Sequence, residues 1–450
     1  MEASPPWQEW IASLGHDTYA YPPFISRQQR MCKCQPVLGA AHFAARPSFA
    51  CLEGGKVVDW RQHVRGGERS LTYCVAKTWL LEHMPAFDLH FLPGAVAVNS
   101  TSMLDDVIAF ALMADKAARW STSVPLATKL AYVLPYASYH ESRQNWRPLF
   151  FAKFFGLVAN ATTVGEAWGR LLAPNVFLDW SHHYWPGSPQ QAGSSNAYTI
   201  QWASSTAPPV VSPLEFVAYG YGSCSAWATY MSYVGRAVGL PARQAGTPCW
   251  NSIFEGVDFR GLSAQNANVS LCWQGGSRER GHGGAFLNNH NWVEVFLPAE
   301  RTTAAVAEAR REGKGGAEEH RVAAGSWEFV NVPPGSKQPG TGLCGGTAFE
   351  PSHGCGFDPT TPRGHECDGL AGGPGAAMRD HEIFAITWSK PEDDDEVVDV
   401  AGRTLSDGKT PLTPLVWSPA LASPLGLPLR NEGLRVINRT EFYRCKPSTY

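Results

Sequence analysis

The hydrophobic period of this chain changes near residue 240, and that change restricts the possible folds more than any other feature. Upstream, between about 100 and 185, apolar residues recur at helical spacing. Downstream, the segment NWVEVFL at 291–297 alternates as a strand does. Helices followed by strands, rather than alternating with them, predict the α+β class. The first helical face is formed by Leu104, Val107, Ile108, Ala111 and Leu112.

The same patterns divide the chain into five regions. We expect an N-terminal region of unclear fold at 1–100, a helical region at 101–205, a mixed core at 206–334 with insertions at 251–289 and 299–325, a Gly/Pro-rich loop at 335–378 and C-terminal strands at 379–450. Further helices are predicted at 124–134 and 145–161, after which Thr163 and Glu166 have the spacing of a capping box. Further strands are predicted at 242–250, 326–332, 381–389, 413–418 and 434–444.

Composition excludes several classes of protein. Hydrophobic residues make up 44% of the 450 and charged residues 17%, which is typical of a globular protein rather than a disordered one. The formal net charge is −3, so the chain lacks the basic surface of a nucleic-acid-binding protein. No apolar run approaches the roughly 20 residues that span a bilayer, and the first residues contain no apolar signal segment. We therefore expect a cytoplasmic protein with no nucleic-acid or membrane partner, and the sequence leaves its oligomeric state open.

The 11 cysteines are irregularly spaced. An odd number without a regular spacing favours reduced thiols over a complete disulfide framework. The Cys and His residues at 344–367 lack the C-x2-C spacing of a structural zinc site, so we predict no metal and no cofactor. Cys224 lies in YGSCSAWATYMSYVGRAVGLPAR, directly before an amphipathic run. Taken alone, it could be a core thiol, half of a disulfide, a metal ligand or a nucleophile.

The residues after Cys224 predict a helix. Trp227 and Tyr230 begin an apolar face at helical spacing, and Gly-Leu-Pro at 239–241 ends the helix. Cys224 therefore lies at a helix N-terminus, where the macrodipole and the free N–H groups favour a thiolate over a thiol. Its neighbours at 222–226 are small and leave room for a substrate to approach. A buried thiol is nevertheless the default role of a free cysteine, so a nucleophile requires further partners.

A nucleophilic cysteine requires a base and a group that orients the base. His290 begins the strand predicted in NNHNWVEV and is the candidate base. Asn331, in WEFVNVPP, is the candidate orienting group, and Asp358, in GFDPTTP, is a rival for that role. A lone histidine at the start of a strand is more often a surface residue. The order Cys, His, Asn along the chain is what supports the catalytic interpretation.

Three blocks, GSCSAWATYMSYVGRAVGLPAR, NHNWVEVFL and WEFVNVP, together resemble the transglutaminase-like superfamily. In that family a Cys begins a helix, a His begins a W-V-E-V strand, and an Asp follows on the next strand in a papain-like site. The resemblance implies that Cys224 is the nucleophile, His290 the base and acid, and Asn331 the orienting group. It extends over about 100–334 and 380–445 and implies that the catalytic core is the mixed region.

The segment VLPYASYHESRQNWRPLFFAKF at 133–154 is similar to a helical segment that precedes the core in bacterial transglutaminase-domain proteins. Two features depart from the family pattern. Asn331 stands where the family has an Asp, although an Asn can still accept a hydrogen bond from a histidine N–H. The segment 251–289 is longer than the usual gap before the His; a surface insertion of this kind costs little stability, and its role as a lid or as a flexible loop is left open.

The chemistry implied by these residues is acyl transfer through a thioester, with a peptide or protein as substrate. Hydrolysis of an amide bond is preferred slightly over protein crosslinking, because calcium sites and accessory β-domains are not recognisable in the sequence. Crosslinking by glutamine acyl transfer is the first alternative. A catalytically inactive binding or scaffold protein that keeps the fold is the second, favoured by Asn331 and opposed by the intact pair of Cys224 and His290.

Overall fold

The computed structural model describes residues 21–36, 49–85, 88, 103–138, 141–173, 176–177, 180, 200–202, 212–247, 290–298, 325–330, 384–388, 397–399 and 435–439. Helices and strands both occur in this part of the chain, in agreement with the predicted α+β class. None of the helices in the described part has both the length and the apolarity needed to cross a membrane.

A six-stranded antiparallel sheet lies at the centre of the C-terminal half, in the order β10-β11-β9-β6-β7-β8. Its strands are β6 (Ala242–Thr247), β7 (His290–Leu297), β8 (Ser326–Val330), β9 (Phe384–Thr387), β10 (Val397–Asp399) and β11 (Arg435–Asn438). Four of them, β6, β8, β9 and β11, lie within predicted strands, and β7 begins one residue before the predicted strand 291–297. The strand β10 was not predicted. β9 pairs with β6 through Ala245 and Ala385. The C-terminal strands therefore complete the same sheet as the strands near Cys224.

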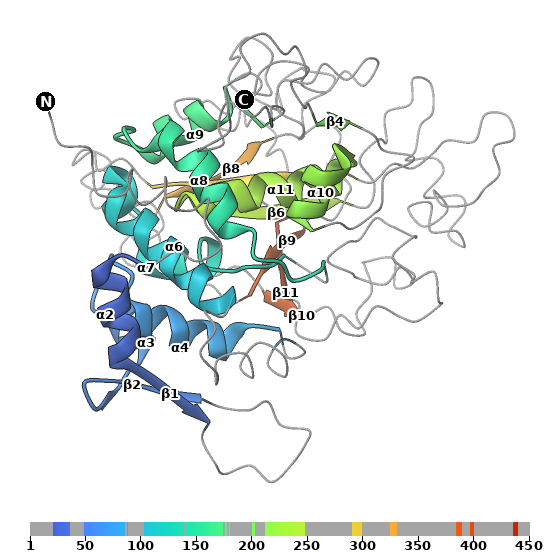
Figure 1. The fold of residues 1–450 in the computed structure, drawn as a ribbon. Helices are drawn as coiled ribbons and strands as arrows, with labels where there is room; N and C mark the ends of the chain where they lie inside the picture. Colours follow the sequence, from blue (N-terminus) through green and yellow to red (C-terminus); the bar gives the residue numbers. More distant parts are fainter. Residues whose placement is uncertain are drawn as a thin grey trace, which may run out of the picture.

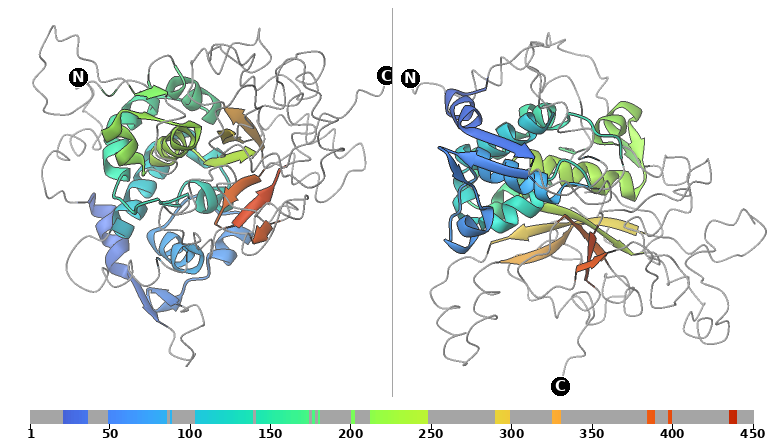
Figure 2. Two further views of the ribbon diagram at one scale, coloured as in Figure 1. Left: turned by 90° about the vertical axis from the view of Figure 1, so that its right-hand side faces the viewer. Right: turned by 90° about the horizontal axis from the view of Figure 1, so that it is seen from below.

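The helices gather on one face of this sheet (Figures 1 and 2). The central one is α11 (Cys224–Ala237), and every one of its residues is buried, because it lies between the sheet and the helices outside it. Gly239, with φ at +88°, lies just after the end of α11. A Cβ added to Gly239 would lie 3.0 Å from the Cβ of Ala114. The outer elements are α6 (Met103–Ala117), a 3₁₀ helix (Arg119–Ser123), α7 (Leu126–Tyr132), α8 (Arg147–Val158), α9 (Val164–Leu171) and α10 (Pro213–Tyr219).

Helices α6, α7, α8 and α9 form where the period or the capping pattern predicts them, whereas α10 and the 3₁₀ helix were not predicted from period. The hydroxyl of Thr163 accepts a hydrogen bond from the Glu166 N–H at 3.0 Å, and this bond begins α9 as the capping pattern predicts. Arg147, at the start of α8, is fully buried and donates to four backbone carbonyls: Arg236 at 2.8 Å, Val133 at 2.7 Å, Leu134 at 3.1 Å and Pro135 at 3.4 Å. Burial lowers the pKa of Arg147 to about 9. This one guanidinium therefore joins α8 to α11 and to the turn after α7.

A buried ion cluster fixes the sheet itself. Glu294 of β7 accepts from Arg243 of β6 at 2.6 Å and from Arg439, directly after β11, at 3.1 Å. The Glu294 carboxylate is fully buried. The Arg243 guanidinium also lies 3.9 Å from the ring centroid of Trp327 on β8. Because these residues come from four strands or their ends, the cluster links most of the sheet's width.

The N-terminal part, for which the sequence predicts no fold, is a small module against α6. It consists of α2 (Pro23–Met31), a three-stranded sheet of β1 (Cys32–Pro36), β2 (Phe49–Glu53) and β3 (Lys56–Val57), and then α3 (Trp60–Arg65) and α4 (Tyr73–His83). Disulfides join Cys32 to Cys74 and Cys34 to Cys51. The prediction of reduced thiols throughout is wrong for these four cysteines, because the strand pairing brings together residues far apart in sequence.

A further two-stranded sheet pairs β4 (Gln201–Trp202) with β5 (Tyr221–Gly222), immediately before α11. Several predicted features lie outside the described residues. They are the insertion at 251–289, most of the one at 299–325, the loop at 335–378 and the strand at 413–418.

Candidate active site

Cys224 is the first residue of α11, as the sequence predicts. The helix begins with the hydrogen bond from the Trp227 N–H to the Ser223 carbonyl at 3.0 Å. The Ser223 side chain makes no capping hydrogen bond. The first turn therefore presents backbone N–H groups that its own N-cap side chain does not engage. A helix start of this kind suits the stabilisation of a negative charge.

Gly222, two residues before Cys224, leaves space for the close packing of α10 against α11. A Cβ on Gly222 would lie 2.4 Å from Cε2 of Phe216 and 2.8 Å from Cβ of Ala226. The Phe216 ring, from α10, is fully buried and lies edge-on to Trp227, with centroids 5.0 Å apart. The small residue before the thiol thus allows α10 to pack closely on α11.

Asn291 of β7 contacts the thiol from the sheet side. Its Nδ2 donates to the Ser225 hydroxyl at 2.6 Å and lies 4.0 Å from the Cys224 Sγ. Asn291, Ser225 and Cys224 are all buried, with 0%, 5% and 7% of their surfaces exposed. Within the described residues, the buried Oδ1 of Asn291 has no hydrogen-bond partner. Asn291 and Ser225 had no role in the sequence prediction, and the signal that could have pointed to Asn291 is its place directly after His290.

Burial raises the pKa of the Cys224 thiol. Backbone and side-chain hydrogen-bond donors of Asn291 and Ser225 act in the opposite direction, but the loss of water outweighs them. Burial at this site therefore opposes the preference for a thiolate that a helix N-terminus gives.

His290 is the first residue of β7 and pairs with Thr247 of β6. Its backbone directly precedes Asn291, the residue whose amide reaches the thiol. β8 ends at Val330, and both candidate orienting residues, Asn331 and Asp358, lie outside the described residues. The structure thus brings the backbone of the candidate base to the strand that contacts Cys224. The catalytic roles of Cys224, His290 and Asn331 remain predictions.

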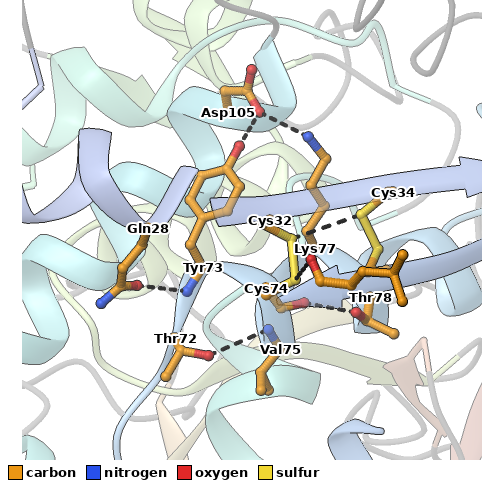
Figure 3. The surroundings of a disulfide bond; sticks show 12 residues. Gln28, Cys32, Cys34, Thr72, Tyr73, Cys74, Val75, Lys77, Thr78 and Asp105 are labelled. Atoms are coloured by element: carbon orange, nitrogen blue, oxygen red, sulfur yellow. Dashed lines mark hydrogen bonds and ion pairs between the residues drawn. A yellow bond between two sulfur atoms is a disulfide. The ribbon is translucent and has the colours of Figure 1, made fainter. Parts of the chain in front are cut away.

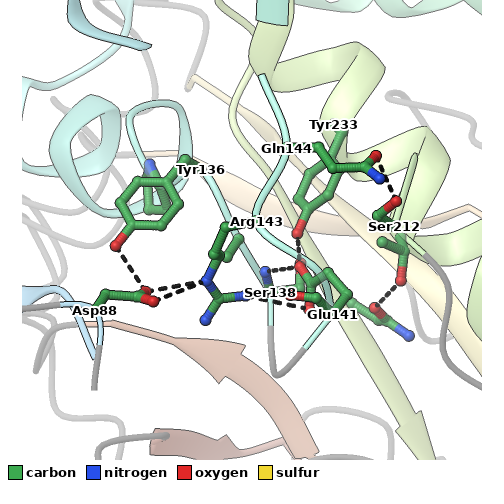
Figure 4. A network of polar contacts seen from close by, with 12 residues as sticks. Asp88, Tyr136, Ser138, Glu141, Arg143, Gln144, Ser212 and Tyr233 are labelled. Carbon is green, nitrogen blue, oxygen red and sulfur yellow. Dashed lines mark hydrogen bonds and ion pairs between the residues drawn. The ribbon is translucent and has the colours of Figure 1, made fainter. Parts of the chain in front are cut away.

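A buried polar network contacts both α10, which precedes Cys224, and α11, which Cys224 begins (Figure 4). Glu141 accepts from the Tyr233 hydroxyl of α11 and from the Ser138 N–H, the latter at 2.7 Å. The Ser212 hydroxyl, which caps α10, donates to Gln144 at 2.5 Å. Burial raises the pKa of Tyr233 well above its usual range, so its hydroxyl stays protonated and donates. The segment 138–144 therefore holds both helices in place.

The network continues to an ion pair between Arg143 and Asp88. The Arg143 Nε donates to both carboxylate oxygens of Asp88, at 3.1 and 3.0 Å, and the Tyr136 hydroxyl donates to the same carboxylate at 2.7 Å. Burial raises the pKa of Asp88, and the Arg143 charge opposes that rise. The residues Tyr136, Glu141 and Arg143 of this network lie between α7 and α8, in the non-helical first part of the segment 133–154 that resembles a helical segment of bacterial transglutaminase-domain proteins.

One family model matches part of the chain. Residues 192–303 match the model of the transglutaminase-like superfamily. The chain carries a transglutaminase-like domain. The match contains Cys224, α11 and β7 and ends before β8. No curated protein and no solved structure shows significant similarity to the chain. The transglutaminase-like match therefore supports cysteine-dependent acyl-transfer or peptidase chemistry at the family level.

Proposed function

We propose that the protein is a cysteine-dependent acyl-transfer enzyme that hydrolyses amide bonds in peptides or proteins. The observation that carries the proposal is the position of Cys224. Its thiol lies in the first turn of a buried helix and within 4.0 Å of Asn291, the residue that follows His290 on β7. A structural core thiol does not need a helix start or two polar neighbours aimed at its sulfur.

The reaction has two steps. His290 takes the proton of Cys224, and the thiolate attacks the amide carbonyl, forming a carbon–sulfur bond. The Cys224 backbone N–H stabilises the oxyanion. His290 then gives its proton to the leaving amine as the carbon–nitrogen bond breaks. Water attacks the resulting thioester and releases a carboxylic acid and the free thiol. Asn331 orients the His290 ring in this scheme, with Asp358 as the rival.

An exposed aromatic pair supports a peptide as substrate. Tyr219 and Tyr221 have 49% and 38% of their surfaces exposed, and their ring centroids are 6.3 Å apart. Both lie within five residues of Cys224 along the chain. Exposed tyrosine rings offer a large apolar contact and a polar hydroxyl, which suits binding of a peptide chain.

A catalytically inactive binding protein is the second candidate. The observation that favours it is the raised pKa of the Cys224 thiol, which makes the resting sulfur a poor nucleophile. A third possibility, crosslinking, differs from hydrolysis only in the acceptor that resolves the thioester.

One assay separates these functions. The protein is incubated with a glutamine-containing peptide, with and without a primary amine, and the products are identified by mass spectrometry. Hydrolysis converts glutamine to glutamate or cleaves the peptide in both conditions, whereas crosslinking joins the amine to the peptide. Cys224→Ser is the matched control and should abolish either product. Unchanged peptides with the wild-type protein, across a panel of sequences, would favour the inactive binding protein.

A further inference from the structure

Two disulfides lie in contact between the N-terminal sheet and α4, and Figure 3 shows Cys32, Cys34 and Cys74 of this group of four cysteines. The disulfides are Cys32–Cys74 and Cys34–Cys51. These two pairs are in contact, because the sulfurs of Cys32 and Cys34 are 3.9 Å apart. The sulfurs of Cys32, Cys34 and Cys51 all lie within 4.8 Å of one another.

The strand register explains how the group forms. Cys32 and Cys34 are two residues apart on β1, so they share one face of the strand. Cys34 is directly opposite Cys51 on β2. Cys74 comes from the second position of α4. β1 therefore contributes two cysteines to the group, and β2 and α4 contribute one each.

Among the described residues of the three-stranded sheet, the buried ones are Cys32 and Cys51. Cys51 is the buried residue of β2, while Met31 and Val57 are 44% and 70% exposed. A small sheet with few buried apolar residues of its own gains stability from a disulfide or a metal. Cys32–Cys74 attaches the sheet to α4, and Cys34–Cys51 joins β1 to β2.

The contact between the two disulfides supports a shared metal site. Two disulfides that each close a loop have no need to touch one another. Four thiolates on one Zn²⁺ ion are tetrahedral at about 2.3 Å from the metal, which sets their sulfurs about 3.8 Å apart. The 3.9 Å between the sulfurs of Cys32 and Cys34 is close to that tetrahedral edge. We propose that Cys32, Cys34, Cys51 and Cys74 are the ligands of a structural Zn²⁺ ion in the reduced protein, and that the two disulfides are its oxidised, metal-free form.

A dithiol reductant converts the oxidised form, with its two disulfides, to the reduced form with four thiols. Two dithiol molecules supply four electrons and four protons, each becoming a disulfide, and the protein gains four thiols. Binding of Zn²⁺ then releases the four protons as the thiolates form. Cys34, which is half-buried, is the member of the group that a reductant reaches most readily.

The test uses the full-length protein, reduced without oxygen by a phosphine and given Co²⁺ or Zn²⁺. We expect one metal ion per chain, and with Co²⁺ the intense thiolate-to-metal absorption of a tetrahedral sulfur site. Cys34→Ser should lose this absorption, and the matched variant Cys344→Ser should keep it. Absence of bound metal in the reduced wild type would overturn the proposal, as would an iron–sulfur chromophore in the purified protein.

If the Cys34→Ser variant does not fold, a second measurement on the wild-type protein tests the same proposal. Reduced wild-type protein is alkylated with and without Zn²⁺, and the labelled peptides are identified by mass spectrometry. The proposal expects Zn²⁺ to protect all four cysteines of the group and to leave Cys344 as reactive as before. Equal labelling of the four cysteines with and without Zn²⁺ would contradict it. Neither measurement depends on the activity of Cys224.

Discussion

Replacing Asn291 with alanine removes the amide that reaches Cys224 from the sheet. The variant loses the 2.6 Å hydrogen bond to Ser225 and the 4.0 Å contact with the sulfur. The amide lowers the pKa of Cys224 in the wild type, against the effect of burial. Without it, the pKa of the thiol should rise further, because one donor to the thiolate is gone while the sulfur stays buried. The backbone N–H groups of Asn291 and Ser225 are unaffected by the change.

The size of the effect follows from the value of one hydrogen bond. Such a bond contributes about 0.5–1.5 kcal/mol, which changes an equilibrium by about two- to twelvefold. The amide is shared with Ser225, and its 4.0 Å distance to the sulfur is long. We therefore expect the lower end of the range, a two- to threefold smaller thiolate fraction at any pH below the thiol pKa, on the order of 0.5 kcal/mol. Removing the unpartnered Oδ1 offsets part of the stability lost with the hydrogen bond.

The assay is the ultraviolet absorbance of the thiolate as a function of pH, taken as the difference from a Cys224→Ser protein. This readout does not require a reagent to reach the buried sulfur. Gln244→Ala is the matched control, since Gln244 is a buried amide on β6 that contacts Ser225 and Thr229 of the same helix. Its removal should leave the titration of Cys224 in place. An unchanged titration in Asn291→Ala, or an equal change in both variants, would refute the reasoning.

Three further changes test the packing around the site by urea unfolding. Gly222→Ala should cost about 1–3 kcal/mol of stability because its Cβ overlaps neighbouring side chains; Gly156→Ala, in open space on α8, should instead stabilise by up to about 1 kcal/mol, and equal effects would contradict the steric argument. Glu294→Gln leaves two arginines without their buried counterion and should cost about 3–5 kcal/mol, whereas Glu166→Gln, in an exposed ion pair, should cost much less; a similar loss in both would show that burial is not the cause. Arg147→Met removes the buried donor to the Val133 and Leu134 carbonyls and should cost at least about 3 kcal/mol, so a near-neutral result would contradict its structural role.

The elements around the site were predictable where a single period determines them. Residues 291–297 alternate and form β7, and the apolar face after Cys224 forms α11. The capping pattern at Thr163 also gave the correct start of α9. In each case the local pattern and the tertiary packing favour the same structure, so reading the period alone is sufficient.

Other features depend on contacts between distant residues, which no local pattern contains. The pKa of Cys224 rises because the sheet and the outer helices bury this residue, while the sequence shows only that it begins a helix. Cys32 and Cys74 meet through the packing of a hairpin on a helix. Glu141 was an unassigned acidic residue in sequence, and its role appears only when Tyr233 of α11 reaches it.

The central claim is that Cys224 is a nucleophile that His290 activates. The most direct measurement is the pH dependence of Cys224 alkylation by iodoacetamide, followed by mass spectrometry in the wild type and in His290→Ala. With His290 present, the base takes the proton and labelling should proceed at neutral pH. Without it, the raised pKa of the buried thiol alone controls the reaction, so the profile should move to higher pH. Identical profiles in the two proteins, both with the pKa of an ordinary thiol, would contradict the account.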